Sequence, residues 1–329
     1  HGQPRGNERG HVSEITIALL GRPLVRWRGQ PAVFRTRKAL ALLAYLAAVP
    51  GPHHRDDLAA MLWPESEPAQ ARSMLRTTLQ HVRQALPGDQ ARPQPLLLAE
   101  RDTLTLARQP DLALDLDTLD QAARAVRTAS LPELEAAAAL YRGEFMQAFQ
   151  LNDVPEFDHW VQSQQPVWRE RAEAVFTAWV KGRFEGGALP QALAAARAWA
   201  AADRLSDAAA RWQMQLLFAL GQPSEALRLF EAHSAALAQA LQTRPGPALA
   251  ALAERIRLQP APQPLPLSAP PAARPGHPAP SLLVGRANEF ASLIGQLHAF
   301  RAGDGRGQPQ AALIVGEAGI GKTRLAREF

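Results

Sequence analysis

Hydrophobic residues near the start of the chain recur at every second position, which is the pattern of half-buried β-strands. Ile15, Ile17 and Leu19 alternate with polar or small residues, and β-prone pieces follow at Leu24–Trp27 and Val33–Phe34. We expect these pieces to form a small antiparallel sheet.

After Thr36 the hydrophobic period changes to that of an amphipathic helix, and three helices are predicted. Prolines and glycines set their limits, because proline lacks the N–H group that a helix interior needs. The first helix begins after Thr36 and ends at Pro50-Gly51, the second covers about Arg55–Trp63 with two acids in its first turn, and the third covers about Pro68–Leu86.

Two short β-prone runs, Leu96–Leu98 and Thr103–Leu106, follow the third helix. The polar segment from Ala99 to Asp102 between them is predicted to be the tip of a β-hairpin. A sheet, three helices and a hairpin in this order indicate a winged helix of the response-regulator type, a helix-turn-helix with a β-wing. We assign residues 12–110 to this α+β domain.

The third helix has two chemically different sides. Leu75, Leu79, Val82 and Leu86 are predicted to form a buried stripe, and no acid lies between Gln70 and Leu86. Hydroxyl, amide and guanidinium groups on the other side are the types that contact base edges and phosphates of DNA. The alternative is an ordinary amphipathic helix with arginines for solubility. The polar side consists of Ser73, Thr77, Gln80 and Gln84, flanked by Arg72, Arg76 and Arg83.

Basic residues are concentrated in the first third of the chain. Residues 1–110 contain 15 Lys and Arg against 9 Asp and Glu, whereas residues 111–258 contain 14 against 18. This distribution predicts an anion-binding module joined to one that does not bind anions. Further candidate phosphate contacts are Arg37, Lys38, Arg55 and Arg101. We interpret the adjacent His53 and His54 as loop residues, because neighbouring histidines do not form a metal pair on one helix face.

Residues 111–258 are rich in Ala, Leu and Arg and are predicted to be an all-α module. A period of 34 residues, typical of tetratricopeptide helical hairpins, favours a protein-interaction and dimerisation role, with a plain helical spacer as the alternative. Trp160, Trp168 and Trp179 are expected in the core or in a groove. The repeated residues are Phe184, Gly187, Ala192 and Leu193, which recur as Phe218, Gly221, Ala226 and Leu227.

The last part of the chain predicts a linker and a phosphate-binding loop. Residues 259–280 contain nine prolines in 22 positions, a composition typical of a semi-rigid linker. In 281–329, an apolar run precedes GEAGIGKT at 316–323, the complete G-x-x-x-x-G-K-T pattern. We expect the start of a truncated P-loop α/β domain, since only six residues follow Thr323. The nucleotide-binding candidates are Gly316, Gly319, Gly321, Lys322 and Thr323, the last as a Mg²⁺ ligand.

Composition excludes several classes of site. The 329 residues include no cysteine, which excludes disulfides, a thiol nucleophile and Cys-ligated metals. No apolar run has membrane-spanning length and no signal peptide opens the chain, so we expect a cytoplasmic protein without membrane contact. No paired carboxylates and no Ser/His/Asp set appear at catalytic spacing, and we do not expect this chain to be an enzyme. Residues 1–11 are interpreted as a tag remnant or a disordered tail.

Several strings of the sequence resemble one family of bacterial regulators. The segments ITIALLGRPLVRWRGQPAVFRTRKALALLAYLA, HRDDLAAMLWPESEPAQARSMLRTTLQHVRQAL and LEAAAALYRGEF, with the two helical hairpins, resemble the antibiotic-regulatory-protein (SARP) class of transcriptional activators. The helical module is similar to the bacterial transcriptional activator domain. LLVGRANEF and ALIVGEAGIGKTRLAREF resemble the start of a STAND-type signalling ATPase.

This resemblance implies a multidomain, mainly α protein that binds promoter direct repeats through its third helix and wing. It implies activation by contact with RNA polymerase holoenzyme and a homo-oligomer on double-stranded DNA. By match to the family's recognition helix, the DNA-reading residues are Arg72, Arg76, Thr77, Gln80 and Arg83. Gln80-His81 stands where an Arg- or Ser-containing pair is common, so the base preference does not carry over.

ATP and Mg²⁺ are expected cofactors of the full-length protein, in which the ATPase would gate oligomerisation, and no cofactor is expected for this piece. The alternative function is a nucleotide-driven signalling scaffold. In that case, the winged helix and the helical repeats would bind protein partners rather than DNA.

Overall fold

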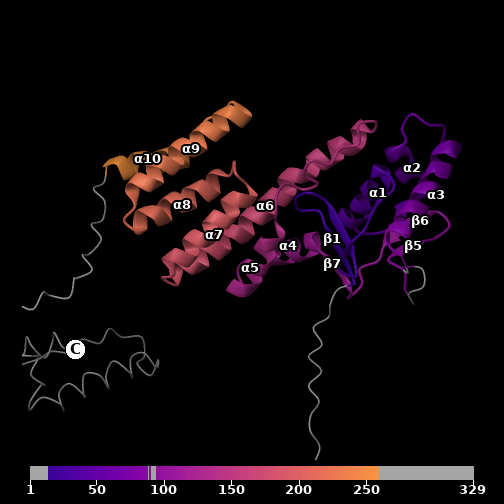
Figure 1. Ribbon diagram of the computed structural model, residues 1–329, viewed down its shortest axis with the longest axis horizontal. Coiled ribbons are helices and arrows are strands. Elements are labelled where there is room, and N and C mark those ends of the chain that lie inside the picture. Colours follow the sequence, from indigo (N-terminus) through magenta and orange to yellow (C-terminus); the bar gives the residue numbers. More distant parts are fainter. Residues whose placement is uncertain (1–13, 88, 90–93, 259–329) are drawn as a thin grey trace, which may run out of the picture. The chain divides into compact units, whose positions relative to one another are not determined.

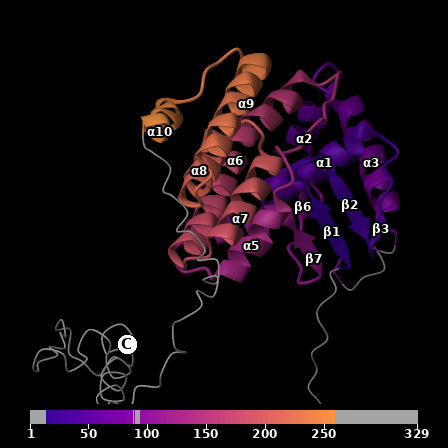
Figure 2. The same cartoon turned by 60° about the vertical axis from the view of Figure 1, so that its left-hand side comes forward.

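The computed structural model describes residues 14–87, 89 and 94–258 of the chain. Its first sheet has the strand order β3-β2-β1-β7 (Figures 1 and 2). The strands are β1 (Ile15–Ala18), β2 (Leu24–Trp27), β3 (Gln30–Pro31) and β7 (Leu112–Leu114). The first three strands pair antiparallel, whereas β7 pairs parallel to β1. The predicted small sheet is therefore confirmed, but it is mixed rather than purely antiparallel.

The third strand was expected at Val33–Phe34, and this prediction is wrong. Arg28 and Gly29 both have positive φ angles, 47° and 79°, and form a two-residue hairpin turn that pairs Trp27 with Gln30. The turn places the strand directly after Gly29. Val33 lies beyond it with 81% of its surface exposed.

Three helices follow the first sheet, close to their predicted limits: α1 (Arg37–Ala48), α2 (Arg55–Leu62) and α3 (Pro68–Ala85). The Thr36 side chain caps α1 by accepting a hydrogen bond from the Ala39 N–H group at 3.2 Å. The predicted hairpin is confirmed as β5 (Leu97–Ala99) and β6 (Thr103–Leu106). His53 and His54, interpreted as loop residues, form β4, which pairs with β6.

The second module is helical after β7, as predicted (Figure 2). Helices α6, α7, α8 and α9 pack in sequence, each against the next. Trp168 and Trp179 are buried in this core, as expected, and Trp160 is half-buried. The helices are α4 (Asp115–Arg124), α5 (Leu131–Leu140), α6 (Pro155–Glu185), α7 (Leu189–Ala202), α8 (Asp207–Ala219), α9 (Pro223–Leu241) and α10 (Pro247–Leu258).

The 34-residue repeat has the same backbone geometry in both copies. Gly187 and Gly221 each have a φ of 75°, and each follows the end of a helix. The next N–H group donates back to the helix, from Ala188 to the Arg183 carbonyl at 3.0 Å and from Gln222 to the Leu217 carbonyl at 2.9 Å. These turns are Schellman caps, which glycine favours because it adopts positive φ without strain.

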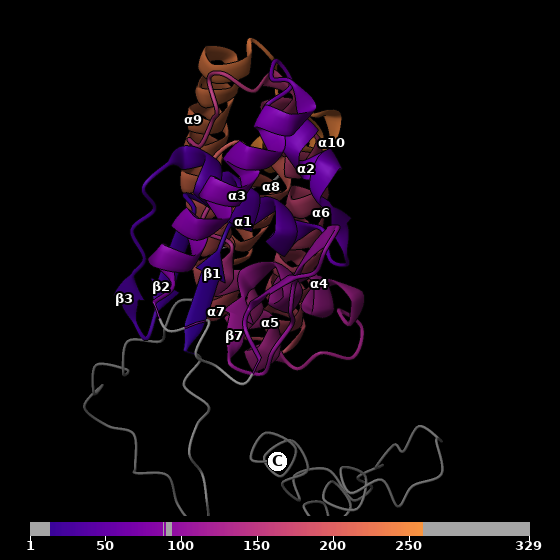
Figure 3. The ribbon, with the colours of Figure 1, turned by 90° about the vertical axis from the view of Figure 1, so that its right-hand side faces the viewer.

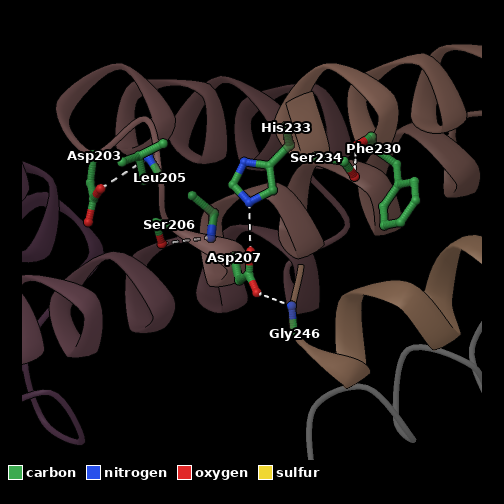
Figure 4. Close-up of polar contacts among 9 residues, drawn as sticks. Asp203, Leu205, Ser206, Asp207, Phe230, His233, Ser234 and Gly246 are labelled. Carbon is green, nitrogen blue, oxygen red and sulfur yellow. Dashed lines mark hydrogen bonds and ion pairs between the residues drawn. The ribbon is translucent and has the colours of Figure 1, made fainter. Parts of the chain in front are cut away.

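One carboxylate joins the last three helices. Asp207, the first residue of α8, has its Oδ1 atom 2.6 Å from Nε2 of His233 in α9 (Figure 4). Its Oδ2 atom accepts a hydrogen bond from the N–H group of Gly246 at 2.6 Å, directly before α10. His233 is 8% exposed. The start of α10 is thereby fixed to the body of the helical module.

Residues 141–153, which we call the connector, join the two modules. The N–H group of Met146 donates to the Leu19 carbonyl at 2.8 Å, and that of Gly21 donates to the Glu144 carbonyl at 2.9 Å. The connector contains most of the string ALYRGEF, and its contacts run along the end of β1. Aromatic rings also pack between the two modules, since the ring centroids of Trp160 in α6 and Tyr45 in α1 are 4.9 Å apart.

Three predicted regions lie outside the described residues: the tail at 1–11, the linker at 259–280 and the segment 281–329 with its phosphate-binding pattern. In the described part of the chain, no helix combines the length and apolar character needed to span a membrane.

Candidate nucleic-acid interface

Helix α3 turns its predicted polar side to water and lies toward the viewer in Figure 3. It begins at Pro68, where the missing N–H group costs nothing because first-turn N–H groups have no partner within the helix. The predicted stripe is confirmed, since Leu75, Leu79, Val82 and Leu86 are all 3% exposed or less. Of the predicted polar residues, Arg83 is half-buried and the others are exposed: Arg72, Ser73, Arg76, Thr77, Gln80 and Gln84.

A cleft of about 490 Å³ lies where α3, the start of α2 and the β5–β6 hairpin meet. It brings together three predicted phosphate or base contacts from different elements, since Arg55, Arg76 and Arg101 all line it with Arg72. Four arginines face two aspartates there, so the cleft is positively charged overall. The remaining lining residues are His54, Asp56, Leu75 and Asp102.

Arg72 is held by an acid of the neighbouring helix. Its Nε and Nη2 atoms donate to Oδ1 and Oδ2 of Asp56 at 2.5 and 2.6 Å. The hydrogen bond from Arg72 lowers the pKa of Asp56, and the bond to Asp56 raises the pKa of Arg72. Both side chains stay more than half exposed. The pair is therefore a charged, solvent-facing fork in the wall of the cleft.

Backbone hydrogen bonds attach the β5–β6 hairpin to the start of α2, at the edge of the cleft. The N–H group of Arg55 donates to the Asp102 carbonyl at 2.9 Å, and β4 directly before it pairs with β6. The Nε atom of Arg55 is buried and has no hydrogen-bond partner in the described part of the chain. This geometry fixes the hairpin tip, and with it Arg101, beside the N-terminal half of α3.

Arg37 and Lys38 lie at the junction of the modules and do not line the cleft. Nε and Nη2 of Arg37 donate to the Gln150 carbonyl at 2.9 and 2.6 Å, and the guanidinium lies 4.7 Å from the Phe149 ring. Nζ of Lys38 is 2.8 Å from Oδ2 of Asp153, and this hydrogen bond lowers the pKa of Asp153. In this structure, these two predicted phosphate contacts hold the connector.

The other flank of α3 borders a groove of about 660 Å³ between the two modules. Thr77, Thr78 and His81 of α3 line it, opposite the connector residues Ala148 and 150–153. Because Arg72 and Arg76 line the cleft instead, Ser73 and Gln80 stand on the ridge between the two depressions. The predicted polar side is thus a ridge with a basic cleft along one flank.

Sequence reasoning did not identify Asp56 as part of this surface. An acid in the first turn of a helix is common because the helix dipole favours it, so position alone gives no sign of a contact with another helix. The contact depends on how α2 and α3 cross. No local pattern contains that information.

The described residues hold no candidate metal site, and the predicted nucleotide-binding residues lie elsewhere in the sequence. Residues 14–87, 89 and 94–258 contain no group of three or more His, Cys, Asp or Glu that could hold a metal ion. The nucleotide-binding candidates, Gly316, Gly319, Gly321, Lys322 and Thr323, lie outside these ranges.

Comparisons with known proteins find a similarity between the helical module and a known domain family. Residues 111–257 match the bacterial transcriptional activator domain. Among solved structures, Mycobacterium tuberculosis EmbR in complex with a low-affinity phosphopeptide has a TM-score of 0.55 and 24% sequence identity. The match covers 75% of this chain and 66% of the EmbR chain, and it shows a shared fold. No curated protein sequence matches the chain.

Proposed function

We propose that the chain is a sequence-specific DNA-binding transcriptional regulator of the activator type. The observation that carries this proposal is the acid-free outer side of α3, which is open to water beside a cleft lined by four arginines. A helix of this size and chemistry fits the DNA major groove. The match of residues 111–257 to an activator domain supports a role in transcription.

In this proposal, the ridge of α3 and the α3 arginines beside it read base edges, whereas the α2 and hairpin side of the cleft binds the DNA backbone. Ser73, Thr77 and Gln80 provide hydroxyl and amide groups for bases, whereas Arg55 and Arg101 carry charges suited to phosphates. The β5–β6 hairpin then acts as the wing. Contacts made by Arg55 and Arg101 position the protein, and contacts made by α3 give sequence preference.

We further propose that the helical module contacts RNA polymerase holoenzyme and a second copy of the chain on direct repeats. The activator-domain match and the stacked helical hairpins support this role. On the sequence pattern alone, residues 316–323 are proposed to bind ATP with Mg²⁺ in the full-length protein. Enzyme activity is not proposed for this chain.

Arg76→Ala tests the proposal directly. A duplex enriched from a random library by the wild-type protein is compared with a scrambled duplex by fluorescence anisotropy over a range of salt concentrations. If Arg76 contacts a base, the variant loses about 1–3 kcal/mol of binding free energy on the enriched duplex. Arg127→Ala removes an exposed arginine outside the interface and is expected to bind as the wild type does.

Two results would contradict the proposal. Binding unchanged by Arg76→Ala together with Thr77→Ala would remove α3 from the interface. An absence of DNA affinity even at low salt, combined with nucleotide-dependent assembly of the full-length protein, would favour the signalling scaffold.

A further inference from the structure

We propose that Asp56 is a positioning residue that orients Arg72 to read a guanine in the DNA major groove. The inference rests on the proposed function and adds to it an acid that is not itself a DNA contact. Its basis is the two-bond contact between Asp56 of α2 and Arg72 of α3 in the wall of the cleft.

The geometry leaves the reading edge of Arg72 free. A guanidinium has five N–H donors, and Asp56 takes one from Nε and one from Nη2. Both donors of Nη1 and the second donor of Nη2 remain. These form the end of the guanidinium, the edge that makes paired hydrogen bonds to O6 and N7 of guanine.

Holding Arg72 before DNA arrives reduces the cost of binding. A long exposed arginine samples many rotamers, and ordering it costs conformational entropy when a complex forms. The fork to Asp56 fixes both the position and the plane of the guanidinium. An acceptor pair on a base edge then meets a donor pair whose direction is already set.

The charge of Asp56 also separates specific from non-specific binding. The carboxylate neutralises much of the attraction that Arg72 would otherwise exert on any phosphate. Arg55 and Arg101, which have no ion pair in the described part of the chain, retain that general attraction. Arg72 therefore adds sequence preference and little salt-dependent affinity.

Asp56→Asn is the test, because it removes the charge and one acceptor while keeping the side-chain size. Affinity is measured on the wild-type-enriched duplex and on its scrambled counterpart. We expect the ratio of the two affinities to fall roughly tenfold, the value of one good paired contact to a base. Affinity for the scrambled duplex should stay equal or rise, with the magnitude of its salt slope larger by about 1 as Arg72 becomes free to bind phosphate.

Asp57→Asn is the matched control. Asp57 is also an exposed acid in the first turn of α2, so its loss changes the net charge and the helix-dipole interaction to the same extent. It does not line the cleft. This variant should raise both affinities together and leave their ratio unchanged. In a double-mutant cycle, Asp56→Asn should have no further effect on the ratio once Arg72→Ala is present.

An unchanged ratio in Asp56→Asn, or an additive effect with Arg72→Ala, would overturn the positioning role. A higher ratio would also overturn it, because it would mean that Asp56 competes with the base for Arg72. If the wild-type protein enriches no sequence from the library, the proposed function itself fails.

Discussion

At the scale of single residues, Asp115 is a buried carboxyl whose pKa is strongly altered by its surroundings. It begins α4 and is 4% exposed. Its Oδ2 atom accepts hydrogen bonds from the N–H groups of Leu19 and Leu20 at 2.7 and 2.8 Å, while Oδ1 has no partner in the part of the chain that the structure describes. Burial raises its pKa to about 6, against the lowering effect of those two bonds. Asp115 thus joins the two modules, and its raised pKa makes the stability of the folded state depend on pH.

Asp115→Asn should change how stability depends on pH. Between pH ~4, near the ordinary carboxyl pKa, and pH about 6, the folded state keeps a proton that the unfolded state has lost. The contribution of Asp115 to stability is therefore largest below pH ~4, falls as pH rises to about 6 and then stays low. The asparagine retains an acceptor for both N–H groups and does not titrate.

Urea unfolding from pH 4 to pH 8 is the measurement for Asp115→Asn. We expect the stability of the variant relative to the wild type to increase by about 2 kcal/mol across this range. Two profiles that stay parallel would show that Asp115 does not carry the raised pKa.

At the scale of elements, the sequence predicts those helices and strands that hydrophobic periodicity and flanking proline or glycine residues define locally. Helix α3 runs from Pro68 to Ala85, one residue short of its predicted end, because a leucine stripe and a following Pro-Gly pair define it locally. Strand β7 was missed because its three residues carry no alternating pattern long enough to recognise, and its partner β1 lies far away in sequence. Parallel pairing of this kind depends on tertiary contacts rather than on local propensity.

The candidate site likewise combines features that the sequence predicts with features that depend on tertiary contacts. That the outer side of α3 is exposed follows from helical periodicity, since burying the leucine stripe turns Ser73 and Gln80 outward. Which cation meets which acid does not follow from it. Arg37 and Arg55 look alike in the sequence, yet one contacts the connector and the other lines the cleft.

The connector should loosen when Arg37 is removed. Arg37→Ala eliminates two hydrogen bonds to Gln150 and the contact with the Phe149 ring, together worth about 1–2 kcal/mol at an exposed position. Amide hydrogen exchange of residues 149–153 should therefore become faster, by roughly tenfold.

Arg35→Ala is the comparison for Arg37→Ala, because Arg35 is exposed and makes no ion pair or hydrogen bond in the described ranges. It should leave exchange in the connector unchanged. Equal exchange rates in the two variants would show that Arg37 does not hold the connector.

At the scale of the whole molecule, the described residues belong to one compact unit. Two features join the domain of the candidate interface to the helical module: β7 completes the first sheet just before α4, and the connector forms hydrogen bonds with the residues that follow β1. A groove between the modules borders one flank of α3. The proposed DNA-reading helix is therefore held at a set position relative to the helical module, which suits a regulator that must present both to one promoter.

The central claim is that DNA binds the outer side of α3 and the hairpin tip. Hydroxyl-radical footprinting of the protein, with and without the enriched duplex, measures this at each side chain. We predict protection of the exposed side chains among residues 72–80 and of Arg101. Any protection of the helices from α6 to α10 should be confined to the surface that contacts a second copy of the chain. Protection confined to the helical module, or none on α3 while the duplex is bound, would contradict the account.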